Sequence, residues 1–379
     1  MQKRIKVVSV GIILIILFIS VIILNNNTNN KHTFKKDGIL YALSLDGKSI
    51  TSFPSKGLYK ANVSCEGADG KWLYDDWKLA IENIAGDVSC DIKFETITKT
   101  YFNDYITGLA GTTQGTGQVV NENGYRYEGK NPNNYVWFNN EYWRIIGVFD
   151  SGSHGQSGKN LVKIIRADVL DGLAWDKSNT NDWTAASLNS LLNGAYYNAQ
   201  DGTDSGYCYG NGNESITSNC DYTKKGIQAG YRSMIANVTW YLGGYSSSDA
   251  TTESFYGYER GTTVYSGGPT TTTGYIGLMY PSDYGYSALS SSCARTTNLS
   301  SYISSACAGQ SWLYGQGDEW TLAPSSDTNY VFNVRGFGAK AGDNLAYRGT
   351  AVRPVLYLDA SVYKIDGEGT LDKPYIIGM

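Results

Sequence analysis

The strongest constraint on this chain is a continuous apolar segment near its N-terminus. Residues 7–24 consist of Val, Ile, Leu and Phe, with only Ser9, Gly11 and Ser20 between them. As a helix this segment spans about 27 Å, close to the ~30 Å hydrocarbon core of a bilayer. It ends in Leu24 and three asparagines, without the small residues of a signal-peptide cleavage site. The pattern predicts an uncleaved transmembrane signal anchor rather than the alternative, a cleaved signal peptide.

Basic residues around this segment indicate its orientation. Three of them directly precede it, whereas the next ones, from Lys31 onward, follow only after an Asn/Thr-rich spacer. Basic residues close to a membrane helix favour the cytoplasmic side. We therefore expect residues 1–6 to be a cytoplasmic tail, residues 7–24 to be the single membrane span, and residues 25–36 to be a polar tether to an extracellular C-terminal part.

The charge beyond residue 36 argues against nucleic acid as a partner. Residues 1–36 contain six Lys/Arg and no acidic residue, which leaves 25 Lys/Arg against 35 Asp/Glu, a net charge of −10, for the remainder. Binding to a phosphate backbone requires a basic surface. Only 17% of all residues are charged, while Gly and Tyr are frequent. This composition favours a β-rich surface protein with many loops.

Six cysteines form three pairs that are close in sequence: Cys65 with Cys90, Cys208 with Cys220, and Cys293 with Cys307. Outside the cytoplasm an even number of cysteines indicates disulfides, although sequence alone leaves several connectivities open. We predict the local pairing because of this proximity. A metal site is the alternative, but no C-x-x-C motif occurs and no histidine lies near a cysteine.

Apolar patterning divides the remainder into two domains. Residues 37–96 are expected to form a small disulfide-linked β domain that resembles a sandwich. Within it, residues 71–82 fit either a strand or a helix. Residues 97–130 are predicted to be a linker with one short helix, at 101–110, and a flexible loop, at 111–123. The large domain covers residues 131–379.

The large domain opens with two apolar stretches on either side of Asn139-Asn140, which predicts a two-residue β-hairpin. Helices are expected at 182–194 and 222–242. Short strands and long polar loops should follow. The other expected strands are at 161–166, 330–334 and 351–358, with a final hairpin over 362–377.

Several motifs resemble a recurring module. They are WRIIGVF at 143–149, WTAASLNSLLN at 183–193, YIGLMYPSDY at 275–284, EWTLAPS at 319–325, AVRPVLY at 351–357 and GEGTLDKPY at 367–375. The module occurs in uncharacterised anchored surface proteins of Gram-positive gut-type bacteria. The first domain, with SFPSKGLY at 52–59, is similar to a module that often precedes it. More remotely, the order of elements is similar to the C-type-lectin-like fold and its formylglycine-generating-enzyme-like variant.

This resemblance implies an α+β, β-rich fold class. The chain is expected to contain an N-terminal transmembrane helix, a small β-sandwich-like domain and a C-type-lectin-like α+β domain. Fold-level similarity does not by itself define a function.

Candidate catalytic groups are few. His32 in the tether and His154 in a Gly/Ser-rich segment are expected to be solvated loop residues, so neither is positioned as a general base. Cys293 and Cys307 are predicted to form a structural disulfide rather than the reactive pair of a formylglycine-type oxidase. No catalytic residue is therefore predicted.

Paired carboxylates beside aromatic residues are typical of sugar-cleaving sites. In this chain Asp283, Asp318 and Glu319 have such neighbours. They support an extracellular carbohydrate-active enzyme as an alternative hypothesis.

Recognition is the leading hypothesis. The chain has 31 Tyr, together with abundant Ser, Gly and Asn, and this mixture is typical of binding surfaces. Alternation along residues 330–335 places Asn333 and Arg335 on the face opposite Phe332. The predicted exposed ligand-binding patch consists of Asn333, Arg335, Lys340, Asn344 and Tyr347. Arg353 is instead expected to be structural, paired with a carboxylate or with carbonyl groups.

Calcium is the one cofactor for which the sequence offers a candidate segment. Residues 201–214 (DGTDSGYCYGNGNE) are rich in oxygen ligands, but their spacing differs from that of an EF-hand, and turn formation explains them equally well. No other cofactor and no metal site is predicted.

Together these features predict a membrane-anchored bacterial cell-surface protein, single-pass in the cell membrane with its C-terminal domain extracellular. It would display a non-catalytic, adhesin-like domain that binds a glycan or a protein ligand on another surface. The alternatives are an extracellular carbohydrate-active enzyme and a structural envelope protein.

Overall fold

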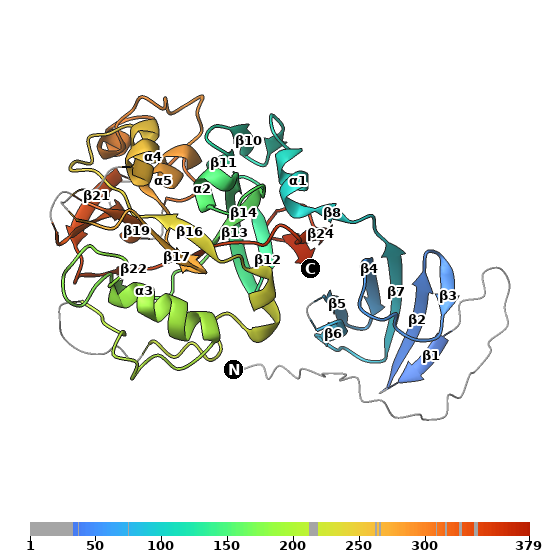
Figure 1. The fold of residues 1–379 in the computed structure, drawn as a ribbon. Coiled ribbons are helices and arrows are strands. Elements are labelled where there is room, and N and C mark those ends of the chain that lie inside the picture. The colour runs from blue at the N-terminus through green and yellow to red at the C-terminus, as the bar shows by residue number, and fades with distance from the viewer. Residues whose placement is uncertain are drawn as a thin grey trace. The chain divides into compact units, whose positions relative to one another are not determined.

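The computed structural model describes residues 33–36, 38–74, 76–211, 219–261, 264, 267–307, 309–314, 317–325, 328–336 and 340–379. The chain divides into two compact units, Met1–Lys99 and Thr100–Met379 (Figure 1). Each unit has its own apolar core.

The small unit is a five-stranded sheet with an additional hairpin. The sheet has the order β1-β2-β7-β4, with β3 paired to β2, while β5 pairs with β6. Alternating residues of β2 and β7, such as Tyr41 and Phe94, are buried, because successive side chains of a strand point to opposite faces. The strands are β1 (Thr33–Lys36), β2 (Ile39–Leu45), β3 (Lys48–Ile50), β4 (Tyr59–Glu66), β5 (Asp69–Leu73), β6 (Lys78–Glu82) and β7 (Val88–Thr96).

Aromatic residues from the β5–β6 hairpin fill the core of the small unit. The ring centroid of Trp72 lies 5.2 Å from that of Trp77 and 4.9 Å from that of Phe94. The segment 71–82, for which the sequence left strand and helix open, therefore contributes two strands whose connecting turn brings both tryptophans into one core.

An eleven-stranded sheet organises the large unit. Its main path is β18-β23-β14-β13-β12-β25-β24-β8, and β11 pairs with β13 and adds β10 and β9. The strands are β8 (Thr100–Tyr101), β9 (Thr113–Gln114), β10 (Gly117–Asn121), β11 (Tyr125–Gly129), β12 (Tyr135–Phe138), β13 (Glu141–Phe149), β14 (Leu161–Arg166), β18 (Ile276–Gly277), β23 (Val355–Tyr357), β24 (Tyr363–Asp366) and β25 (Tyr375–Gly378).

The hairpin predicted around Asn139-Asn140 is confirmed. These two residues join β12 to β13 and have φ angles of 57° and 60°. A two-residue hairpin turn of the favoured type needs positive φ at both positions, and asparagine tolerates this conformation better than most residues.

A second sheet has the order β15-β22-β19-β20-β21, and β16 pairs separately with β17. These strands are β15 (Gly172–Ala174), β16 (Val238–Tyr241), β17 (Thr271–Gly274), β19 (Glu319–Pro324), β20 (Tyr330–Arg335), β21 (Lys340–Leu345) and β22 (Gly349–Ala351).

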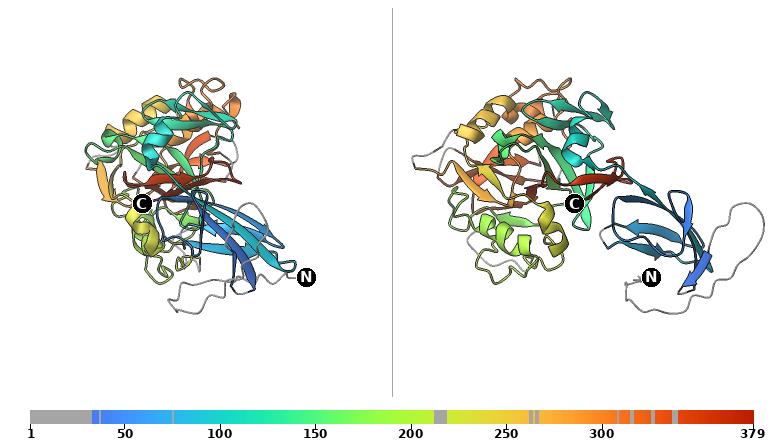
Figure 2. Two further views of the ribbon diagram at one scale, coloured as in Figure 1. Left: turned by 90° about the vertical axis from the view of Figure 1, so that its right-hand side faces the viewer. Right: turned by 45° about the vertical axis from the view of Figure 1, so that its right-hand side comes forward.

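Short helices complete the large unit. In Figures 1 and 2, α4 and α5 lie side by side at one end of this unit, and α3 lies at the other end. The helices are α1 (Phe102–Thr107), α2 (Ser151–His154), α3 (Ser187–Leu191), the π-helical continuation η1 (Leu192–Tyr196), the 3₁₀ helix η2 (Ala229–Met234), α4 (Thr252–Gly261), α5 (Pro281–Ser287) and the 3₁₀ helix η3 (Leu299–Ser304).

The predicted fold class needs a correction at its first element. In the part of the chain that the structure describes, no helix has both the length and the apolar character needed to cross a membrane. The segment predicted to be transmembrane, residues 7–24, lies outside the described residues, as do the predicted cytoplasmic tail and the tether up to residue 32. For the residues that the structure describes, the fold class is β-rich.

The prediction of a linker at 97–130 is wrong for most of its length. The short helix is present as α1, but the expected flexible loop contains β9 and β10. Strand β10 pairs with β11, and β11 pairs with β13 in the main sheet. The missed signal was the turn Asn123-Gly124, in which both residues have positive φ, as a hairpin turn requires.

Helix positions also differ from the prediction. The helix expected at 182–194 begins only at Ser187, because Asp182 Oδ1 accepts the Thr184 N–H at 2.9 Å and holds the preceding residues in a turn. The helix expected at 222–242 is reduced to η2, followed by the strand β16. Helices α4 and α5 lie where only strands and loops were expected.

All six cysteines form the three disulfides that sequence proximity predicted: Cys65–Cys90, Cys208–Cys220 and Cys293–Cys307. The first joins directly opposite residues of β4 and β7 in the small unit. A disulfide stabilises mainly by restricting the unfolded chain.

The Cys65–Cys90 disulfide gives a first test. Replacing both cysteines with Ala should lower the free energy of unfolding of the small unit by about 3 kcal/mol, because the bond restricts a loop of 25 residues. Urea unfolding of the full chain, followed by tryptophan fluorescence, measures this loss. The matched control, Cys208→Ala with Cys220→Ala, should leave the transition of the small unit in place, and an unchanged midpoint for the first variant would contradict the prediction.

Candidate functional site

The most concentrated polar chemistry in the large unit is an ion cluster around Asp283. This residue lies in the first turn of α5. Its Oδ1 accepts a hydrogen bond from Arg126 Nη1 of β11 at 2.9 Å, and its Oδ2 lies 2.5 Å from Lys163 Nζ of β14. The Tyr280 backbone N–H also donates to Oδ2, at 3.0 Å. All three charged side chains are only 1% exposed, so the cluster is closed to solvent.

Aromatic rings surround the two cations of this cluster. The Arg126 guanidinium lies 4.4 Å from the ring centroid of Tyr286 and 4.5 Å from that of Phe149. Lys163 Nζ lies 4.4 Å from the ring centroid of Tyr280. Such faces attract cations, most strongly where water is excluded.

The cluster shifts the pKa values of its members. Burial raises the pKa of Asp283, but Lys163 and Arg126 lower it more, so the result is about 2. Burial lowers the pKa of Lys163 to about 8; Asp283 opposes this shift, and the positive charges of Arg126 and Arg260 add to it. Asp283 therefore stays ionised at neutral pH, and the Lys163 ammonium loses its proton more readily than usual.

A second carboxylate, Glu259 of α4, is buried beside this cluster. Its two oxygens accept hydrogen bonds from the Ser282 backbone N–H at 2.8 Å and from Ser282 Oγ at 2.5 Å. Arg260 Nη1 lies 3.3 Å from it. Burial raises the pKa of Glu259 to about 7, with a smaller contribution of the same sign from Asp283.

Glu319 and Asp318 are the other two carboxylates that the sequence suggested for sugar cleavage. They lie in different surroundings. Glu319 is buried in β19, and its carboxylate is bound by Arg353 at 2.8 Å and 2.7 Å. Arg353 also donates to the Leu313 carbonyl at 3.2 Å, so its predicted structural role is confirmed. Asp318 is exposed and accepts the Gly336 N–H at 2.8 Å. Each of the three acids thus has its own partner.

The expectation for His154 is wrong. The side chain is fully buried at the end of α2. Its Nδ1 accepts the Gln156 N–H at 3.1 Å, and its Nε2 then donates to the Phe149 carbonyl at 3.1 Å. Burial lowers its pKa, so the ring is neutral at neutral pH. His32, the other histidine, lies outside the described residues.

The register of β20 and β21 brings the predicted ligand-binding residues together. Arg335 is opposite Lys340, and Val331 is opposite Asn344. This pairing places Asn333, Arg335, Lys340 and Asn344 at positions of one face.

That face is not the exposed patch that was predicted. Asn333 is only 1% exposed, and neither atom of its amide has a hydrogen-bond partner within the described residues. Four consecutive residues of β20 are buried, so both faces of this strand are covered. Phe255 of α4 packs against Phe332 on the face opposite Asn333.

The other members of the predicted patch are less buried. Arg335, Asn344 and Tyr347 are half-buried. The side chain of Lys340 is outside the described part of the structure. Ligand binding by these residues stays a prediction.

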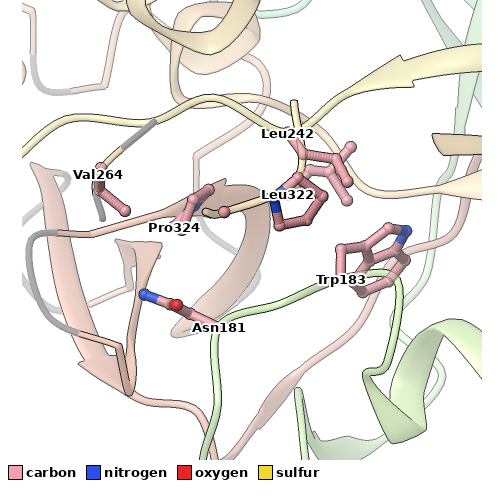
Figure 3. A pocket seen from close by; sticks show the side chains of 8 residues that line it. Asn181, Trp183, Leu242, Val264, Leu322 and Pro324 are labelled. Carbon is pink, nitrogen blue, oxygen red and sulfur yellow. The ribbon is translucent and has the colours of Figure 1, made fainter. Parts of the chain in front are cut away.

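A small hollow lies next to this sheet (Figure 3). Its lining comes from the segment before α3, from the end of β19 and from the residues between β16 and β17. None of the lining residues is charged, and Asn181 is the polar one. They are Asn181, Trp183, Leu242, Val264, Gly268, Pro269, Leu322 and Pro324.

Close to the hollow in the chain, two tyrosines stack face to face. Tyr245 and Tyr258 have ring centroids 4.0 Å apart and an interplanar angle of 6°, and both are half-buried. The hydrogen bond between their hydroxyls raises the pKa of Tyr258. Gly243 and Gly244, which connect Leu242 to Tyr245, permit this approach, since a Cβ on either would collide with a backbone oxygen of Tyr258 or Pro324. This Gly-Gly pair is the sequence signal that could have indicated the site.

The predicted calcium segment is only partly described, up to residue 211. There Asp201 Oδ1 accepts the Thr203 N–H at 2.9 Å, as in an ordinary turn. Across the described ranges no group of three or more His, Cys, Asp or Glu is placed to hold a metal ion. Calcium binding at 201–214 stays a prediction.

A comparison of the chain with protein-family models, with curated proteins and with solved structures finds no match. The resemblance to the surface-protein module and to the C-type-lectin-like fold stays a prediction. The geometry of the described residues is therefore the basis for a functional proposal.

The Glu319–Arg353 pair provides a test of how the core depends on buried charge. Arg353→Met should lower the free energy of unfolding by about 3–5 kcal/mol, because it leaves Glu319 buried without its counter-ion. Adding Glu319→Leu should recover most of this loss. Chemical denaturation of both variants measures the difference, and a double variant as unstable as the single one would contradict it.

Glu259 gives a prediction for pH dependence. Its pKa in the folded protein, about 7, lies above the value of 4.5 for a free side chain. The stability from its protonated form is therefore complete below pH 4.5 and is lost as the pH rises through 7, by about 3 kcal/mol in total.

Glu259→Gln should remove this contribution. The difference in free energy of unfolding between wild type and variant should change by about 3 kcal/mol from pH 4.5 to about 7.5. His154 contributes with the opposite sign in both proteins and cancels in this difference, because its lowered pKa makes stability fall with decreasing pH. Two parallel pH profiles would show that Glu259 keeps its ordinary pKa.

Proposed function

We propose that this chain is a non-catalytic recognition protein that acts outside the cytoplasm. Its large unit binds a ligand on another surface, and a neutral glycan is the class that the exposed groups suit best. The binding surface is centred on the half-buried Tyr245–Tyr258 stack, which is close in the chain to Leu242 of the hollow.

The disulfides support the compartment. All six cysteines are paired, and such bonds persist in oxidising environments but are rare in the reducing cytoplasm. The small unit, with its own core and its own disulfide, would serve as a spacer.

One observation carries the choice of recognition over catalysis. The groups with shifted pKa values that resemble catalytic acids and bases, Asp283, Glu259 and Lys163, are buried and bound to partners inside the protein. The half-buried groups beside the hollow are tyrosines, whose rings offer rigid contact area and whose hydroxyls offer hydrogen bonds. This distribution of groups suits binding rather than acid–base chemistry.

The uncharged lining supports a neutral ligand. A sugar ring presents C–H groups to an aromatic face and hydroxyl groups at its edge, and the ring and hydroxyl of Tyr258 offer both kinds of partner. The acidic balance of the chain beyond residue 36 disfavours polyanionic ligands.

Glycan-array binding of the full chain tests the proposal. Tyr258→Ala should weaken binding to the recognised glycan about tenfold, which corresponds to about 1.4 kcal/mol. The matched control is Tyr275→Ala, which disrupts a similar stack between Tyr197 and Tyr275, with centroids 4.2 Å apart, at another place. It should bind like wild type. An equal loss of glycan binding in both variants would overturn the proposal. Cleavage of a glycan by a protein that does not stay bound to it would also overturn the proposal.

The two alternatives expected from the sequence gain less support. For a carbohydrate-active enzyme, Asp283 and Glu319 would have to reach a substrate, yet both are buried and paired with cations. A structural envelope protein would not need a stacked aromatic pair beside a hollow.

A further inference from the structure

We propose that Lys163 and Asp283 become joined by an amide bond between their side chains. The inference concerns the interior of the large unit and does not rest on the proposed function. Lys163 Nζ lies 2.5 Å from Asp283 Oδ2, although the two residues are 120 positions apart in the chain. Both side chains are 1% exposed.

The surroundings of Lys163 favour a nucleophilic amine. Its Nζ lies 4.4 Å from the ring centroid of Tyr280 and 5.7–5.8 Å from those of Phe149, Trp240 and Tyr357. This shell excludes the water that would stabilise an ammonium ion, and two arginines add positive charge nearby. The neutral amine, which is the reactive form, is therefore easier to reach than for an exposed lysine.

The surroundings of Asp283 suit the charge that develops when its carboxyl is attacked. Arg126 Nη1 donates to Oδ1 at 2.9 Å, and this donor is held in place because Arg126 Nε is bound to the Glu122 carbonyl at 3.0 Å. A fixed donor of this kind stabilises the oxyanion of a tetrahedral intermediate. Arg126 itself keeps compensating contacts afterwards, with the rings of Phe149 and Tyr286.

The reaction needs no co-reactant. One ammonium proton of Lys163 moves to Oδ2, which gives an amine beside a carboxylic acid. The nitrogen lone pair attacks Cγ, a second proton passes from nitrogen to Oδ2, the Cγ–Oδ2 bond breaks, and water leaves. Of the three protons on the ammonium nitrogen, two depart with the water and one stays on the amide, so atoms and charge balance.

Arg126 also makes the formation of the amide slow. Together with Lys163 it holds the carboxyl ionised before the reaction, so the neutral acid is a minor form and the amide accumulates slowly after folding. The product replaces the Lys163–Asp283 ion pair of a water-free core by a neutral amide, whose oxygen can still accept the hydrogen bond from Arg126. The reverse reaction needs a water molecule in the same closed space, so the bond persists once it has formed.

Mass spectrometry of the reduced full chain is the direct test. The amide lowers the mass by about 18 Da, the mass of one water. In a tryptic digest, residues 160–166 should remain uncleaved after Lys163 and should be joined to residues 261–295, which contain Asp283. Separate peptides 160–163 and 164–166, with 261–295 unmodified, would overturn the proposal.

Two variants test whether the amide joins Lys163 to Asp283. Lys163→Arg removes the nucleophile and should give the unlinked peptide 261–295. Asp283→Asn should still form the link, now with loss of ammonia, and should yield the same branched peptide as wild type. Because the decisive result comes from the wild-type protein, poor folding of either variant leaves the test intact. A branched peptide that persists in Lys163→Arg would contradict the assignment to Lys163.

Discussion

The large unit depends on one carboxylate that satisfies two cations. Asp283 connects α5 to β11 through Arg126 and to β14 through Lys163, and it accepts the Tyr280 N–H at the start of its own helix. Breaking a buried ion pair leaves an uncompensated charge in the core, which is far more costly than the pair is stabilising. The position of α5 on the main sheet is therefore tightly constrained.

This constraint extends to the neighbouring helix. Glu259 of α4 binds Ser282, the residue next to Asp283, through both its backbone N–H and its hydroxyl. Helix α4 then covers β20 through Phe255 and Phe332. The chain of contacts from β14 to α5, α4 and β20 links the two sheets.

The same arrangement places the ionisable groups of the cluster inside the protein and leaves tyrosines nearer to the surface. Asp283, Lys163 and Glu259 are enclosed, and their partners are other groups of this protein. What they can react with is therefore each other, as in the amide proposed for Lys163 and Asp283. Half-buried tyrosines near the hollow remain for contact with a ligand, which is why recognition and an internal cross-link are compatible proposals on independent observations.

Local sequence was sufficient where neighbours in the chain decide the geometry. The Asn139-Asn140 turn and the three disulfides are such cases, because a tight turn depends on the φ preferences of two residues and a short loop keeps its cysteines close together. The β-rich character followed from composition in the same way. Arg353 was also interpreted correctly as structural, although its partner, Glu319, was not identified.

Tertiary structure decided everything that depends on what covers a segment. Nothing in SGSHGQSG shows that His154 packs against Tyr357, with ring centroids 5.5 Å apart, and alternation in β20 gave no sign that both of its faces are covered. Asp283, Lys163 and Arg126 come from three distant segments, so only folding reveals that they share one site. The physical reason is that periodicity records how a side chain points, whereas burial and pKa depend on long-range contacts that the local pattern does not contain.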